Sequence, residues 1–499
     1  MSQSKKKRKR EQSRVTAVVM AAGLGKRMRS SLPKVMHPVA GRPMVWYMAR
    51  VAHRVADTTV VVVGHGGEAV RSYLEDEKES VGPCLIVTQT EQKGTGHAVL
   101  QARQILEHQI SPVETCLILN GDTPLLTEQT IRALLLRHRR RKATVTLLTT
   151  LLEDPRGYGR VVRGKHNEVL YVVEDRDASK EERSIQEVNV GTYVVHTPFL
   201  LQALCSLRPN NAQQEYYLTD IAAIANKQGC RVSACVAPDQ IETMGINTRE
   251  HLSVAERQVR EQICRYWMRA GVTLLDPRRT VIDAGVNIGK DTVLYPDVTL
   301  QGHTRVGNHS TIRSHSRLTD CTIGNHVHIQ DSCVLDGAVV EEGAVIGPFA
   351  HLRPGATVCR QAKVGNFVEL KQTTLGISSK ANHLTYLGDT VVGREVNIGA
   401  GTITCNYDGY KKEQTVIEDH VFIGSDTQLI APVRIGRGAL IAAGTTVTQD
   451  IPPDALGIAR TAQVNKQGVA ARRRAVLAVP ASGRASTPSR KRVQGTHRS

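Results

Sequence analysis

Aliphatic side chains recur at nearly every sixth position between Ile282 and Val447. They form three phased runs: Ile282, Ile288, Leu294, Leu300, Val306, Ile312 and Leu318; Val334, Val340, Ile346, Leu352, Val358, Val364 and Leu370; and Ile417, Ile423, Leu429, Ile435, Ile441 and Val447. A period of six fits neither an amphipathic helix nor an alternating strand, and it is typical of hexapeptide repeats.

Each hexad is expected to form one short strand and a turn, with its aliphatic side chain pointing inward. Three hexads close one triangular coil and neighbouring coils bury each other's cores, so the pattern predicts a left-handed parallel β-helix. Such prisms serve as acyltransferases, as anhydrases and as oligomerisation modules, so this fold does not decide the function.

A different pattern occupies residues 15–247, where β-branched runs alternate with helical periodicity. Buried strands are predicted at 15–20, 59–63, 85–88, 117–119 and 144–149, and helices at 44–55, 96–106 and 128–138. The alternation predicts a doubly wound α/β domain, in which ligands bind at the carboxyl ends of the strands.

One more helix is predicted over 249–268, and Asp276-Pro277 ends the segment that follows it. The expected organisation is a basic tail (1–14), the α/β domain (15–248), a linker helix (249–275), the β-helix (276–462) and a second basic tail (463–499).

The composition restricts the cellular compartments in which the protein is expected. No apolar stretch is long enough to span a bilayer. The basic start and the apolar residues after it do not form a secretory signal, because the apolar part is short and runs into a glycine-rich loop. The ten cysteines have no paired spacing, which suits free thiols in a reducing compartment and predicts a cytoplasmic protein.

The net charge of +18 resides mostly in the two tails. Residues 1–14 carry +6 and residues 463–499 carry +9, so the body is close to neutral. The composition of both tails predicts disorder. Solvated tails without a function and nonspecific contact with polyanions are both compatible with this charge.

The first predicted strand leads into Gly23-Leu-Gly25, and Arg27 and Lys34 follow closely. Glycines directly after a strand let backbone N–H groups approach a phosphate, and the two cations add charge where a triphosphate would lie. A Gly-x-Gly can also form a simple tight turn. The spacing fits neither a P-loop nor the three-glycine dinucleotide pattern.

Two further strand ends carry polar residues. Residues 89–96 follow the third strand, and Asp122 follows the fourth in the sequence Asn-Gly-Asp. An Asp at this position is well placed to hold Mg²⁺ against phosphate oxygens. The alternative is that Asp122 caps the next turn or helix.

Four polar stretches interrupt the hexads, at 352–355, 365–371, 382–388 and 399–409. A purely structural β-helix does not need them, and the last leads into a loop, about 404–415, that is expected to project from the prism. His383 lies in one of these stretches. Five other histidines of the prism are interpreted as surface residues: His303, His309, His315, His326 and His328.

In their order along the chain, the motifs of the α/β domain resemble those of a sugar-nucleotide pyrophosphorylase. Further motifs narrow the match: Gly157-Tyr-Gly-Arg160, Glu174, Glu187-Val-Asn189, Gly245-Ile-Asn247, and Asn-His-Leu-Thr-Tyr at 382–386. Over about residues 15–462 the chain is similar to the bifunctional N-acetylglucosamine-1-phosphate uridylyltransferase/glucosamine-1-phosphate acetyltransferase family, the GlmU family.

In the α/β domain this resemblance implies in-line attack by the sugar phosphate on the α-phosphorus of UTP, with pyrophosphate leaving and with Mg²⁺ as cofactor. The implied residues are Ala21, Ala22 and Gly23 at the nucleotide, Arg27 and Lys34 on the phosphates, Gln89, Gly94 and Thr95 on the uracil side, Gly159, Glu174 and Asn189 around the amino sugar, and Asp122 and Asn247 on the metal.

In the prism the resemblance implies that His383 is the general base of acetyl transfer from acetyl-CoA, since an amine attacks a thioester only when neutral. The other implied residues are Arg353, Lys371, Tyr386 and Asn397 on glucosamine 1-phosphate, and Ala400, Asn406, Tyr407, Ser425, Ala443 and Arg460 on acetyl-CoA. The family forms homotrimers, in which the projecting loop completes a neighbour's site.

Two positions depart from the family pattern. Lys26 stands where Thr is usual, and Asn120 stands where an aromatic or small residue often precedes Gly-Asp. Neither removes a charged or metal-binding group.

Two other functions are compatible with these folds: a single-activity sugar-1-phosphate nucleotidylyltransferase with a purely oligomerising prism, and a non-catalytic regulatory subunit. The intact His383 and Lys371 argue against the first, and Asp122 argues against the second.

Overall fold

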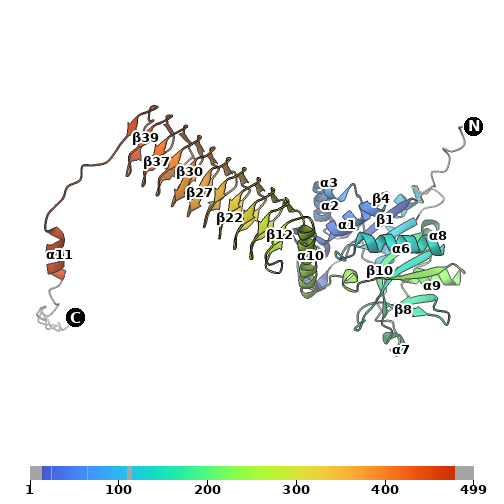
Figure 1. Ribbon diagram of the computed structural model, residues 1–499. Helices are drawn as coiled ribbons and strands as arrows, with labels where there is room; N and C mark the ends of the chain where they lie inside the picture. The colour runs from blue at the N-terminus through green and yellow to red at the C-terminus, as the bar shows by residue number, and fades with distance from the viewer. Residues whose placement is uncertain (1–13, 24, 65, 109–114, 478–499) are drawn as a thin grey trace, which may run out of the picture.

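The computed structural model describes residues 14–23, 25–64, 66–108 and 115–477. A rounded α/β part and a long prism lie end to end, with helix α10 (Arg249–Arg269) at their junction (Figure 1). The fold class predicted from the two hydrophobic patterns is confirmed by this architecture.

The α/β part is built on a nine-stranded sheet in the order β11-β7-β10-β6-β1-β4-β5, with β8 and β9 attached to β10. Its strands are β1 Val15–Ala21, β4 Thr58–Val63, β5 Leu85–Thr88, β6 Thr115–Asn120, β7 Val145–Leu151, β8 Arg160–Arg163, β9 Val169–Val173, β10 Glu187–His196 and β11 Val232–Val236. The five predicted strands are all present. Strand β10 runs antiparallel between β6 and β7, so the sheet is mixed.

Helices cover the sheet, and apolar clusters fill the space between the layers. They are α1 Met44–Val55, α2 Gly67–Asp76, α3 Lys78–Val81, α4 Thr95–Leu100, α5 Arg103–His108, α6 Glu128–Arg141, α7 Lys180–Arg183, α8 Thr197–Ser206 and α9 Asp220–Lys227, with 3-10 helices η1 Lys26–Met28, η2 Lys34–Met36 and η3 Ile241–Thr243. The single helix predicted over 96–106 is therefore two helices. At the break, the Gln101 side chain donates to the His97 carbonyl at 3.0 Å.

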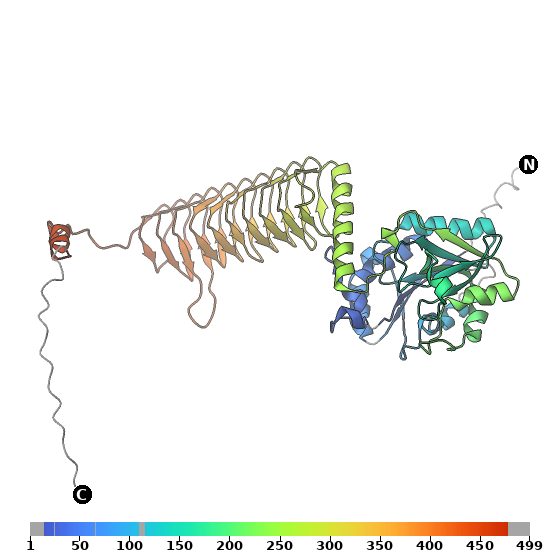
Figure 2. The ribbon, with the colours of Figure 1, turned by 90° about the horizontal axis from the view of Figure 1, so that it is seen from below.

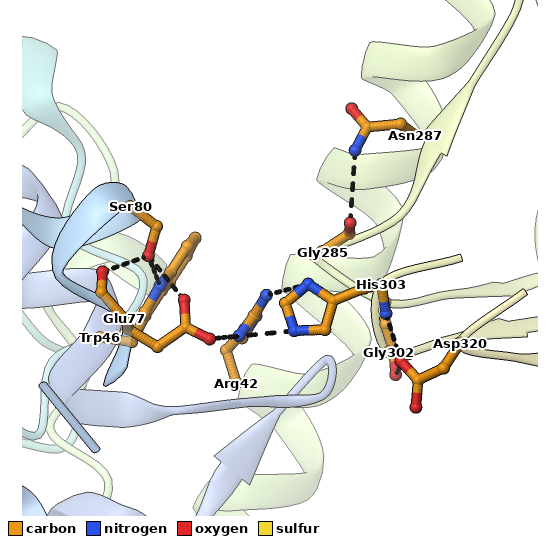
Figure 3. Close-up of polar contacts among 10 residues, drawn as sticks. Arg42, Trp46, Glu77, Ser80, Gly285, Asn287, Gly302, His303 and Asp320 are labelled. Atoms are coloured by element: carbon orange, nitrogen blue, oxygen red, sulfur yellow. Dashed lines mark hydrogen bonds and ion pairs between the residues drawn. The ribbon is translucent and has the colours of Figure 1, made fainter. Parts of the chain in front are cut away.

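The α/β part touches the first coils of the prism (Figure 3). Arg42, in strand β3 (Arg42–Pro43), pairs with Glu77, and its Nη2 lies 3.4 Å from His303 Nδ1. A Cβ added to Gly285 would lie 2.8 Å from Arg42 Nη2, so the guanidinium packs closely against the prism backbone. The two parts thus share a close polar contact as well as the connecting helix.

Three parallel sheets of eleven, ten and nine strands form the faces of the prism, from β12 (Thr273–Leu274) to β41 (Leu456–Gly457). One continuous apolar cluster fills its interior. Nineteen of the twenty repeat aliphatics are buried as predicted, and Val334 is the exception. The strands used below are β22 Val334–Asp336, β25 His351–Leu352, β27 Lys363–Asn366, β28 Glu369–Lys371, β30 Lys380–His383, β31 Tyr386–Gly388, β33 Asn397–Ile398, β34 Ile403–Cys405, β35 Thr415–Ile417, β36 Phe422–Ile423 and β39 Leu440–Ile441.

The prediction of an inward Val334 is wrong. This residue is half-buried, and its neighbour Leu335 occupies the interior. The cause is a step of five residues at one corner, between Leu335 and Val340, where the chain passes from the ten-stranded to the nine-stranded sheet. The paired inward residues Ile323 and Val340 are 17 positions apart across this corner, whereas Ile288 and Val306 in an earlier coil are 18 apart. A strict period of six cannot follow this shortening.

The segment between β34 and β35 leaves the prism as a projecting loop (Figure 2), as predicted for about residues 404–415. Tyr407 and Lys412 pair across it in an isolated β-bridge. Tyr410 within the loop is 96% exposed, so the loop offers an aromatic side chain to solvent.

Residues 1–13 and 478–499 lie outside the described residues, and so do the expectations made for those parts of the tails. Residues 469–477, within the second tail, form helix α11 (Val469–Leu477), which corrects the expectation of disorder for this stretch. Its alanines, arginines and leucine have high helix propensity. In the part of the chain that the structure describes, no helix is long and apolar enough to cross a membrane.

Candidate active sites

A cavity of about 280 Å³ opens at the carboxyl ends of β1, β5 and β6. Seven residues predicted for the nucleotide or the metal line it: Ala22, Gly23, Lys34, Gln89, Gly94, Thr95 and Asp122. This is the edge of a doubly wound sheet at which ligands bind. Ala21 instead ends β1 and is buried beside Val63 of β4, so its side chain faces the core.

The turn after β1 is shaped by its glycines. No atom lies within 4 Å of the position of a Cβ on Gly23, so its backbone is open to a ligand. Gly25 has a φ of +60°, and a Cβ there would lie 2.7 Å from Lys34 Cβ. The turn therefore packs on the stem of Lys34, and it leaves room for a phosphate beside Gly23.

Lys34 lies at the centre of a charged cluster. Its ammonium forms an ion pair with Asp122 and donates to Asn247 Oδ1 at 2.7 Å. The Arg27 guanidinium donates to the same Asn247 oxygen at 2.8 Å. The fold thus brings both predicted metal ligands and both predicted phosphate cations into one cluster.

The donor set of this cluster fits Mg²⁺. Asp122 and Asn247 supply a carboxylate and an amide oxygen, which are hard donors, and the Lys34 ammonium between them stands in for a cation. Among the described residues, no group of three or more His, Cys, Asp or Glu side chains forms a candidate metal site. Magnesium here would therefore need phosphate oxygens and water to complete its shell.

The predicted uracil side is held by glutamine side chains. Gln89 is buried, and its Nε2 lies 3.0 Å from His97 Nδ1. Gln92 was not predicted, yet it lines the cavity and donates to the Ala22 carbonyl at 2.8 Å. At Gly94, which has a φ of +102°, a Cβ would lie 2.8 Å from the Tyr216 carbonyl, so only glycine fits there.

The three residues predicted around the amino sugar form a separate group, outside the lining of the cavity. The Asn189 N–H donates to the Gly159 carbonyl at 2.8 Å, and a Cβ on Gly159 would lie 3.4 Å from Glu174 Oε2. Glu174 accepts from the Thr219 hydroxyl at 3.2 Å, and burial raises the pKa of Glu174.

Tyr158 connects the two groups, and the sequence reasoning did not single it out. It precedes Gly159, and its hydroxyl is hydrogen-bonded to the backbone of Gly245. Burial raises the pKa of Tyr158, and the nearby Asp122 and Arg27 charges act on it in opposite directions. The aromatic residue between two glycines, in Gly157-Tyr-Gly159, was the sequence feature that could have identified Tyr158 as a site residue.

Of the two departures from the family pattern, Asn120 lies at the cavity. Asn120 lines it and donates from Nδ2 to the Val190 carbonyl at 3.1 Å. Gly191 makes this possible, because a Cβ there would lie 2.4 Å from that nitrogen. Lys26 begins η1, directly before Arg27.

In the prism, strand register gathers the predicted acetyl-transfer residues. The inward residues of β30, β33, β36 and β39 pair from coil to coil. The residues two positions after them therefore follow one another along one edge: His383, Ala400, Ser425 and Ala443. Arg460 joins this edge by donating to the Ala443 carbonyl at 2.9 Å.

The His383 ring is exposed at this edge, and its Nδ1 lies 2.6 Å from Asn366 Oδ1. Asn366 pairs with His383 from the preceding coil. It lies within one of the polar interruptions, but the sequence reasoning assigned it no role.

Three cations gather on the next face of the prism. Arg353 and Lys371 follow paired residues of β25 and β28, so they lie on adjacent coils. Lys412, from the projecting loop, comes within hydrogen-bonding distance and lowers the pKa of Lys371. Arg353 also pairs with Glu369 at 3.0 Å. Lys412 was not predicted, although its position in the projecting loop was a signal.

Tyr386 and Asn406 converge over Gly388. A Cβ on Gly388 would lie 2.4 Å from the Tyr386 hydroxyl and 2.7 Å from Asn406 Nδ2, so only glycine lets them meet. Tyr407 is exposed and donates to the Gly409 carbonyl at 2.6 Å. Asn397 lies on β33 in the eleven-stranded sheet, and so on a different face from the three cations.

Comparisons with known proteins cover most of the chain. The MobA-like NTP transferase domain matches residues 17–190, and the bacterial transferase hexapeptide (six repeats) matches residues 414–449. A protein of Pelobacter propionicus named bifunctional protein GlmU is 48% identical over 455 residues, which cover 91% of this chain and 97% of that protein. Proteins of the same name from Trichlorobacter lovleyi and Shouchella clausii are 48% identical over 453 residues and 47% identical over 451 residues, at 91% and 90% of this chain and 97% of each relative.

Proposed function

Because the chain belongs to the GlmU family of bifunctional proteins, we propose that its two sites together make UDP-N-acetylglucosamine from glucosamine 1-phosphate. The prism transfers an acetyl group from acetyl-CoA to the amine of the sugar, and the α/β domain then transfers a uridylyl group from UTP to the product. The observation that carries this proposal is that one chain holds both the Lys34–Asp122–Asn247 cluster and the His383 edge.

For uridylyl transfer, the chain contributes positioning and positive charge. The open backbone at Gly23 receives the nucleotide, and Arg27 and Lys34 offset the charge of the phosphates. The sugar phosphate attacks the α-phosphorus of UTP, a P–O bond forms, and the bond to the pyrophosphate oxygen breaks. Glu174, directly after β9, and Asn189, in β10, orient the amino sugar.

Asp122 and Asn247 would hold Mg²⁺, which would stabilise the negative charge of the triphosphate and the leaving pyrophosphate. The Lys34 ammonium now contacts both of these oxygens, and with the metal bound it would pair with the phosphates instead.

For acetyl transfer, neutral His383 takes a proton from the amine of glucosamine 1-phosphate. The nitrogen attacks the thioester carbonyl, a C–N bond forms and the C–S bond breaks. The sulfur of coenzyme A leaves as a thiol after receiving a proton from the imidazolium. Arg353, Lys371 and Lys412 meet the sugar phosphate, because clustered cations favour an anion. Acetyl-CoA lies along Ala400, Ser425 and Ala443.

One reaction mixture tests the proposal and separates it from the two other functions weighed above. Pure protein incubated with glucosamine 1-phosphate, acetyl-CoA, UTP and Mg²⁺ is expected to release both free thiol and pyrophosphate. Without acetyl-CoA, pyrophosphate release should fall and should return on addition of N-acetylglucosamine 1-phosphate. Pyrophosphate without thiol would indicate a single-activity nucleotidylyltransferase, and neither product would indicate a regulatory subunit.

We place both reactions in the cytoplasm, where the two co-substrates UTP and acetyl-CoA occur together. The chain fits a reducing compartment, since Cys84 in the α/β part and Cys333 in the prism carry free thiols.

The working assembly is proposed to be a homotrimer. The projecting loop exposes Tyr407 and Tyr410 to solvent beyond the prism, as a segment that serves a neighbour would. Phe349 and Phe367 stack at 5.2 Å beside the His383 edge and are 51% and 56% exposed, so apolar surface is present for a second copy to cover.

Complementation between two inactive variants tests whether the projecting loop completes a site on a neighbouring chain. Inactive His383→Ala protein mixed with inactive Asn406→Ala protein is expected to regain part of the thiol release after subunit exchange, because some sites then combine an intact loop with an intact His383. Mass spectrometry would verify that mixed trimers form. If mixed trimers form and release no thiol, each site is complete within one chain.

The basic tails are proposed to bind polyanions without taking part in catalysis. A shortened chain of residues 15–462 is expected to keep both activities and to elute from heparin at much lower salt than the full chain. Clustered lysines and arginines bind polyanions through counterion release, which weakens steeply with salt. If the shortened chain is a folded trimer that has lost either activity, the tails belong to a site.

A further inference from the structure

The contact between Asn366 and His383 fixes where the proton lies on the imidazole. An amide oxygen can only accept a hydrogen bond, and Asn366 Oδ1 lies 2.6 Å from His383 Nδ1. Nδ1 therefore carries the proton of the neutral ring, and the lone pair lies on Nε2. A base that must accept a proton from an amine needs this tautomer, with Nε2 exposed at the edge of the prism.

The backbone beneath this contact is tightly held. The Leu384 N–H donates to the Asn366 carbonyl at 3.0 Å, and the Thr385 hydroxyl donates to the His383 carbonyl at 2.8 Å. A Cβ on Gly365 would lie 1.9 Å from the Asn382 carbonyl, so the two coils approach as closely as backbones can. Asn366 and His383 therefore face each other from fixed positions.

The elements packed against His383 carry both charged and neutral side chains. Lys380 on its own strand pairs with Lys363 of β27, and both are exposed. Strand β33 contributes the neutral Asn397, and Asp426 follows one coil beyond Ala400 on the same edge. The next face carries Arg353, Lys371, Glu369 and Asp389, and Lys412 reaches Lys371 from the projecting loop. The partner that orients the ring is thus a neutral amide, which places no charge beside the imidazole.

We propose that Asn366 is a positioning residue for acetyl transfer, which holds His383 in the tautomer whose Nε2 accepts the proton of the amine. The inference rests on the proposed acetyl transfer at this site. Asn366 acts through His383 and touches no reacting atom, so its loss should slow the chemical step without weakening substrate binding.

Two substitutions at this position separate orientation from packing. Asn366→Leu keeps the size of the side chain but removes the acceptor. We expect kcat for thiol release to fall about 10- to 100-fold, the usual effect of losing an orienting partner, with KM for both substrates unchanged. Asn366→Asp keeps the acceptor and should retain most of kcat. Its carboxylate should move the acid limb of the pH–kcat profile to higher pH, because it stabilises the imidazolium.

The matched control is Ser314→Ala, which lies on the same edge of the prism, three coils before Asn366. It should leave kcat, KM and the pH profile unchanged. All variants are assayed as full-length protein, with oligomer mass, melting temperature and pyrophosphate release measured in parallel.

The outcomes distinguish the inference from the function on which it rests. Absence of thiol release by the unmodified protein would refute the proposed acetyl transfer. An active protein in which Asn366→Leu keeps full kcat would overturn the positioning role alone. The positioning role would also be overturned if Asn366→Leu changed KM instead of kcat. The same holds if its kcat fell together with loss of the trimer or a lowered melting temperature, because that would indicate a structural role. An Asn366→Asp profile without a shift would also overturn it.

Discussion

Replacement of Asp122 by alanine is expected to lower pyrophosphate release by at least about 10²- to 10³-fold, while thiol release persists. The Asp122 carboxylate is one of two oxygen donors that converge on the Lys34 ammonium, and it is the charged one. Its loss removes the main attraction for a divalent cation beside the phosphates. Acetyl transfer should not change, because the prism has its own apolar core and its own site.

The matched control is Asp154→Ala, which removes an exposed aspartate of the same domain that pairs only locally with Arg156. It should keep both activities. Initial rates of pyrophosphate release and of thiol release, measured across a series of Mg²⁺ concentrations, provide the test. Loss of thiol release in a folded Asp122→Ala protein would contradict the assignment of two separate sites.

His383→Ala is expected to have the opposite effect, a fall in thiol release of about 10²- to 10⁴-fold with pyrophosphate release from N-acetylglucosamine 1-phosphate intact. Without the imidazole, the amine has no positioned base to take its proton before it attacks the thioester. The exposed position of the ring means that its removal leaves no cavity in the core, so stability should hardly change.

His328→Ala serves as the matched control, because His328 lies on the surface of the same prism and outside the polar interruptions. It should leave thiol release at its original rate. An active His383→Ala protein would show that another group accepts the proton, and the assignment of the edge as the acetyl-transfer site would then need a different base.

The repeat fold could be predicted from the sequence because its signal is local. Each inward aliphatic is set by the strand and turn that carry it, and one coil repeats the next, so a period of six was visible without any knowledge of contacts. The prediction failed at Val334, because the corner after Leu335 is shortened by one residue and moves the frame, and the shape of a corner is not encoded in hydrophobicity. The helix predicted over 96–106 failed in a similar way, since helical periodicity continues across its break.

The sequence by itself determined which residue types stand at strand ends and in the interruptions of the prism, and this sufficed to single out Asp122, Lys34 and His383. The tertiary structure alone decided which of them meet. Lys34 and Asn247 lie 213 positions apart and share a hydrogen bond. Tyr158, Asn366 and Lys412 joined the sites only through sheet pairing, strand register and the path of a loop. The physical reason is that a motif records local chemistry, whereas a site depends on distances that only the packed chain sets.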